Sequence, residues 1–65
     1  NQPVGYYTYI WREVFLIRET PKAILIIFDR RKMWIPKVWI VQIKQNTGRS
    51  VKIKISEYYW AKKLA

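Results

Sequence analysis

The chain has 65 residues, which is enough for one small domain, and its 13 Lys and Arg against four Asp and Glu give a net charge of +9. It contains no Cys and no His, so we expect no disulfide, no metal centre, no cofactor and no catalytic site. Because 51% of the residues are hydrophobic and the longest apolar run, residues 23–28, is short, we expect neither a disordered tail nor a membrane-spanning helix. The absence of Cys and of a signal-peptide pattern is compatible with the cytoplasmic protein that we expect.

Two strands are predicted in the first half of the chain. Residues 6–19 follow Gly5 and are rich in aromatic and β-branched side chains, which favour a strand, and the length of this stretch predicts a bend or bulge. Thr20-Pro21 breaks the stretch, and residues 22–28 form the second strand. A polar loop, residues 29–32, then leads into a hairpin.

Three more strands are predicted in the second half. Residues 33–35 begin the third strand, which Pro36 interrupts or marks as an edge. Residues 38–44 form the fourth. Like residues 22–28, they are apolar on both faces over most of their length, with Gln42 and Lys44 polar, which predicts two central strands. After a turn at residues 46–49, residues 51–55 alternate strictly, with Lys52 and Lys54 on the outer side.

A short helix is predicted over residues 56–64. Ser56 is a candidate N-cap, Glu57 suits the positive end of the helix dipole, and an aromatic stripe through Tyr59 and Trp60 can pack on the sheet. The predicted fold is mainly β: a small antiparallel sheet or barrel, OB-like or SH3-like, of about five strands with a short C-terminal helix. Residues 1–65 form a single domain.

Basic residues alternate with aromatic ones in the second half of the chain, as in proteins that stack bases on aromatic rings within a cationic groove. We therefore predict a non-catalytic nucleic-acid-binding module that prefers single-stranded DNA or RNA, or structured RNA; the choice between DNA and RNA stays open. The predicted contact residues are Arg30, Arg31, Lys32, Trp34, Lys37, Trp39, Lys44, Arg49, Lys52 and Lys54.

Several alternatives compete with this interpretation. The tryptophans could fill the core, the cations could be ordinary solvated side chains, and Glu13 and Glu19 are expected to form solvated ion pairs with Arg12 and Arg18. The same composition also suits a small basic ribosomal or ribonucleoprotein component, or a phage-type protein-interaction (inhibitor) module. A homodimer would cover the second apolar face of the central strands.

Three short motifs resemble a known group of proteins. The sequences TPKAILI from Thr20, WIPK from Trp34 and WAKKL from Trp60 are similar to those of small phage, plasmid and host-genome proteins. Those proteins have a Thr-x-Lys-Ala strand, a Trp-(Ile/Leu)-Pro-Lys motif and a short terminal helix. The resemblance implies a compact β module from a mobile element or an archaeal-type source. Members often continue with Ser where this chain has Val38.

Overall fold

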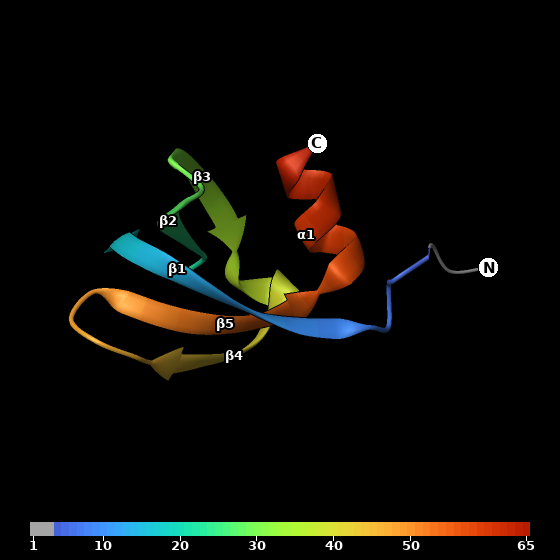
Figure 1. Ribbon diagram of the computed structural model, residues 1–65, viewed down its shortest axis with the longest axis horizontal. Helices are drawn as coiled ribbons and strands as arrows, with labels where there is room; N and C mark the ends of the chain where they lie inside the picture. The colour runs from blue at the N-terminus through green and yellow to red at the C-terminus, as the bar shows by residue number, and fades with distance from the viewer. Residues whose placement is uncertain (1–3) are drawn as a thin grey trace.

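The computed structural model describes residues 4–65 and shows five antiparallel strands in one sheet, followed by a short helix (Figure 1). The mainly β fold predicted from the sequence is confirmed. The sheet has the order β3-β2-β1-β5-β4 and is not closed into a barrel. The elements are β1 (Tyr9–Glu19), β2 (Ala23–Phe28), β3 (Arg31–Pro36), the 3-10 turn η1 (Lys37–Trp39), β4 (Ile40–Gln45), β5 (Ser50–Ser56) and α1 (Glu57–Leu64).

β1 is the long central strand, and it pairs with different neighbours along its length. Its first part pairs with β5, and its last part pairs with β2. The pairing register shifts between Leu16 and Arg18, which confirms the predicted bulge. The strand begins at Tyr9 rather than at the predicted residue 6, because residues 4–7 form a turn in which Gly5 adopts a φ of 80°.

The β2–β3 connection is tighter than predicted. Asp29 and Arg30 alone form the turn, and both have positive φ values, 52° and 65°. Two consecutive positive φ values are typical of the two-residue hairpin turn whose twist matches that of the strands. Arg31 and Lys32, which the sequence placed in the loop, therefore belong to β3 and pair with β2.

The prediction that residues 38–44 form a central strand is wrong. Residues Lys37–Trp39 form η1, β4 begins at Ile40, and β4 lies at an edge of the sheet with Val41 and Ile43 exposed. β3 and β4 are opposite edges, which in a flat sheet of five strands would be about 19 Å apart. A three-residue 3-10 turn, which rises about 2 Å per residue, cannot bridge that distance, so the sheet must curl.

The core lies on the inner side of this curl, and α1 packs against it. Trp60 of the helix is only 4% exposed and meets Phe28 of β2 edge to face, with ring centroids 4.8 Å apart. The helix stands beside β3 in Figure 1. The buried hydrophobic residues are Val14, Ile24, Ile26, Met33, Ile35, Val51, Ile53, Ile55 and Trp60.

The start of α1 differs from the predicted cap. Ser56 precedes the helix as expected, but its side chain makes no capping hydrogen bond. Its hydroxyl donates instead to the backbone carbonyl of Tyr6, at 2.7 Å. The first helical amides, those of Glu57 and Tyr58, donate to the carbonyls of Thr8 and Gly5. The N-terminal segment therefore supplies the acceptors that the helix end requires.

No helix among residues 4–65 is both long enough and apolar enough to cross a membrane.

Candidate nucleic-acid interface

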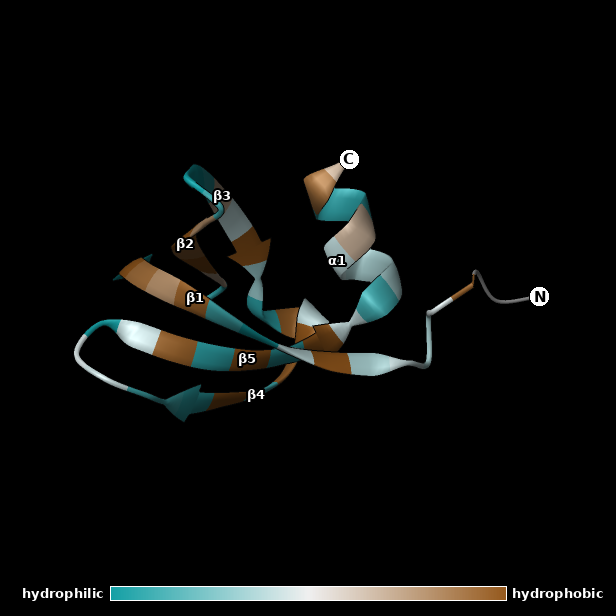
Figure 2. Cartoon of the chain, in the orientation of Figure 1, coloured by the Kyte–Doolittle hydropathy of each residue, from teal (hydrophilic) through white to brown (hydrophobic). Residues whose placement is uncertain are grey.

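The side of the sheet opposite the core, which we call the outer face, collects several of the predicted contact residues. Along β5, Val51, Ile53 and Ile55 are buried, so Lys52 and Lys54 point to the outer face, as predicted; this alternation is visible in Figure 2. Cross-strand pairing extends the face over all five strands. Its members include Tyr9, Trp11, Glu13, Phe15, Arg18, Leu25, Ile27, Lys32, Trp34, Gln42, Lys44, Ser50, Lys52 and Lys54.

Four aromatic rings on the outer face remain accessible to solvent. Trp11 and Phe15 of β1 are 37% and 48% exposed, and Trp34 of β3 is 43% exposed. Tyr9, also exposed, lies at the end of the same row of β1 residues. Because α1 packs on the core through Trp60, it leaves these rings uncovered. The outer face is therefore a surface on which flat, unpaired rings can stack.

Lysine side chains lie between and beside these rings. Lys54 is directly across from Trp11 in the β1–β5 ladder, and Lys52 is across from Glu13. Lys44 of β4 places its Nζ atom 5.1 Å from the centroid of the Trp11 ring, a cation–π distance. The pairing thus brings positive charge next to an exposed indole, which is the combination that binds a stacked base and its phosphate.

Glu13 is the one acidic residue on the outer face within residues 4–65, and its contacts differ from the prediction. Its Oε2 atom accepts hydrogen bonds from the Ser50 hydroxyl, at 3.0 Å, and from the Asn46 side-chain amide, at 3.1 Å. The expected ion pair with Arg12 does not form, because Arg12 lies opposite Ile53 on the core side and donates to the Trp11 carbonyl. Two uncharged donors therefore hold the Glu13 carboxylate in place.

Trp39, a predicted contact residue, lies away from the outer face. In η1 it packs against the core and stacks on Tyr59 of α1, with centroids 4.6 Å apart and planes 8° apart. Hydrogen bonding with Tyr6, and then burial, raises the pKa of Tyr59 above its usual value. The alternative that the sequence left open, a core tryptophan, applies to Trp39, whereas Trp34 is exposed.

The three predicted arginines lie in turns or beside one, outside the paired rows of the outer face. Arg30 occupies the β2–β3 turn, and Arg31 donates from its guanidinium to the carbonyl of Leu64 at the end of α1, at 3.1 Å. Arg49 lies in the β4–β5 turn and donates to the carbonyl of Ile17 in the β1 bulge, at 3.3 Å. Arg31 and Arg49 therefore tie separate elements together, and the run Arg30-Arg31-Lys32 does not form a single patch.

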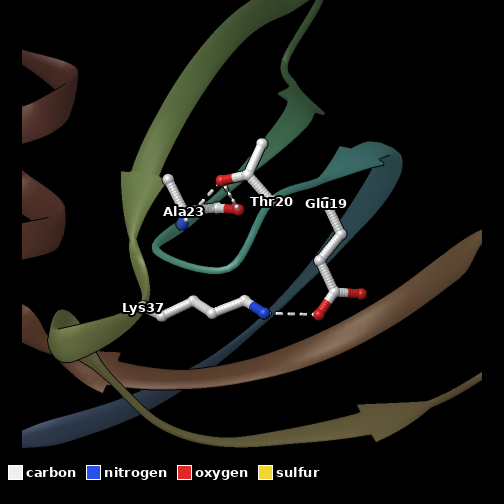
Figure 3. A network of polar contacts seen from close by, with 4 residues as sticks. All are labelled: Glu19, Thr20, Ala23 and Lys37. Carbon is white, nitrogen blue, oxygen red and sulfur yellow. Dashed lines mark hydrogen bonds and ion pairs between the residues drawn. The ribbon is translucent and has the colours of Figure 1, made fainter.

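Lys37 forms an ion pair with an acid at the end of β1. Its ammonium group donates to the carboxylate of Glu19 at the end of β1 (Figure 3), not to a group on the outer face. Next to this pair, the Thr20 hydroxyl and the backbone of Ala23 exchange hydrogen bonds and close the β1–β2 turn. The expected pairing of Glu19 with Arg18 is not seen. A shallow depression lined by Glu19, Lys37 and residues 40–43 adjoins β4.

Sequence reasoning missed the aromatic residues of β1. Trp11 and Phe15 share a face with Tyr9, and the aliphatic side chains of Ile10 and Val14 point the other way. This separation of aromatic from aliphatic residues at alternate positions was readable in the sequence. Arg12, a charged residue on the core side between Ile10 and Val14, interrupts this pattern and makes it hard to recognise.

Searches for related proteins found no family model that matches the chain, and no curated protein or solved structure matches it significantly. The resemblance to small mobile-element proteins therefore stays a prediction.

Proposed function

We propose that this protein is a non-catalytic nucleic-acid-binding module that holds unpaired bases of DNA or RNA on its outer face. The observation that carries the proposal is the presence of accessible rings, among them Trp11, Phe15 and Trp34, on one uncovered face together with lysines. The rings offer stacking energy of about 1–3 kcal/mol per base, and the net charge of +9 attracts the phosphates.

Single strands suit this face better than a duplex. In a duplex the flat faces of the bases are stacked on one another, whereas in a single strand they are free to stack on protein rings. Duplex DNA is commonly read by a helix that enters the major groove. Within the described residues 4–65, the α-helix is α1, which has eight residues and packs on the core through Trp60. It is therefore not free to enter a DNA groove.

A tryptophan fluorescence titration tests the proposal directly. Single-stranded oligonucleotides should quench the fluorescence at lower concentrations than duplexes of the same length, because stacking places a base against Trp11 or Trp34. Replacing both by Phe should abolish most of the quenching while retaining a ring for binding. Trp39→Phe is the matched control and should leave the quenching intact. Quenching that depends on Trp39 instead would contradict the assignment of the outer face.

A protein-interaction module is the second candidate, and the free edge of β4 favours it. Three hydrophobic side chains are exposed at or near the depression that Glu19, Lys37 and residues 40–43 line: Val38, Val41 and Ile43. An edge strand offers unpaired backbone groups to an added strand. Sedimentation without nucleic acid tests the homodimer form of this prediction. A ribonucleoprotein component would instead bind tightly only to assembled RNA.

A further inference from the structure

We infer that Glu13 makes the outer face selective for unpaired guanine. The inference rests on the proposed function and concerns base selection at the same face. Glu13 stands between Trp11 and Phe15 on the outer side of β1, two residues from each, so a base that stacks on either ring brings its edge near the carboxylate. A negative charge among the stacking rings and lysines lowers the affinity for phosphates. We therefore looked for a ligand group that this carboxylate could bind.

The lysines around Glu13 do not neutralise it directly. Lys52 lies across from Glu13 in the β1–β5 ladder and Lys44 lies one strand further, yet neither forms an ion pair with it among residues 4–65. Lys44 sits over the Trp11 ring instead. The hydrogen bonds from Ser50 and Asn46 both end on Oε2. No hydrogen bond within the described part of the chain uses Oε1, so this oxygen is available to a ligand.

Guanine is the base whose Watson–Crick edge best matches a carboxylate. An ionised carboxylate only accepts hydrogen bonds. Guanine presents two adjacent donors, its N1–H and its N2 amino group. Adenine and cytosine each present one amino donor next to an acceptor, and thymine and uracil present one N–H between two acceptors. These edges are free only in unpaired bases. The charge of Glu13 thus weakens binding to every strand, while its Oε1 atom, whose two lone pairs can accept from both donors, favours guanine. Together these two effects increase the discrimination between bases.

Anisotropy titration of the full chain with labelled single strands tests the inference. The probes are a thymine strand and the same strand with one central guanine. The guanine strand should bind about five- to tenfold more tightly, the lower part of the range expected for a well-paired base edge. Inosine lacks the N2 amino group and should lose most of this gain. The 7-deaza analogue of guanine keeps both donors and should retain it. If the 7-deaza analogue loses the gain, a lysine reads N7, and the inference fails.

Two variants connect the preference to the carboxylate. Glu13→Gln should abolish the guanine preference while binding the thymine strand at least as tightly as the wild type. Glu19→Gln, the control, removes an acid of the same strand that pairs with Lys37, and it should keep the preference. Thermal melts confirm that both variants are folded. Equal binding of both strands by the wild type overturns the inference alone, whereas binding to neither strand overturns the proposed function as well.

Discussion

The salt dependence of binding follows from the number of cations on the outer face. Five basic side chains belong to it: Arg18, Lys32, Lys44, Lys52 and Lys54. For single strands, each neutralised phosphate contributes about −0.7 to the slope of log K against log salt concentration, so five contacts give about −3.5. Raising the salt from about 50 mM to about 200 mM should therefore weaken binding roughly a hundredfold, as measured by fluorescence or anisotropy titration.

Single charge removals decide whether the outer face is the source of this slope. Lys52→Gln should make the slope shallower by about 0.7, because it removes one phosphate contact. Lys62→Gln is the matched control: it removes the same charge from α1, where Lys62 lies near the Tyr58 ring. The Lys62 variant should keep the slope of the wild type. Equal effects of the two variants, or a wild-type slope near zero, would refute the reasoning.

Three further predictions concern stability. Trp39→Ala should lower the unfolding free energy by about 2–4 kcal/mol, since it removes core packing and the stack on Tyr59. Trp34→Ala should lower it by about 1 kcal/mol but weaken oligonucleotide binding. Denaturant titrations that rank the two variants the other way would contradict this prediction. Arg30→Gly should stabilise the protein by about 1 kcal/mol, because the φ of 65° is unfavourable for a residue with a Cβ atom, and a lower melting temperature would contradict it. The raised pKa of Tyr59, caused first by hydrogen bonding with Tyr6, means that the folded state favours the neutral phenol. Its contribution to stability is present below the usual pKa of 10.0 and is lost as the pH rises through the folded pKa, so Tyr59→Phe should flatten the alkaline loss of stability in melts above pH 10.0.

The sequence predicted correctly those elements whose pattern of side chains has a single structural explanation. β5 alternates because one side is core and the other is solvent, and the lysines of this strand were placed correctly. The helix was found within one residue, because its aromatic stripe and its terminal charges agree. The bulge in β1 followed from the length of an extended run that no single flat strand accommodates easily.

The wrong prediction came from a pattern that has two possible causes. Residues 38–44 are apolar on both sides over most of their length, a pattern that predicts a central strand. In the structure the run is divided: Trp39 belongs to η1 and packs on the helix, and Val41 and Ile43 lie exposed on an edge strand. Pro36 has no amide hydrogen, and β3 ends at this residue. The curl that brings the sheet edges together depends on contacts between distant residues, which local patterning does not encode.

The pairing of β1 with both β2 and β5 has a consequence for the order of folding. β2 and β3 are joined by a two-residue turn, so their hairpin closes with little loss of chain entropy and can form within microseconds. The β1–β5 ladder joins Tyr9 to Ser56, from nearly opposite ends of the described chain, and must close a long loop first. The outer face spans both regions, so Trp34 should reach its final environment early. The Trp11 end of the same face should take shape only in the last step.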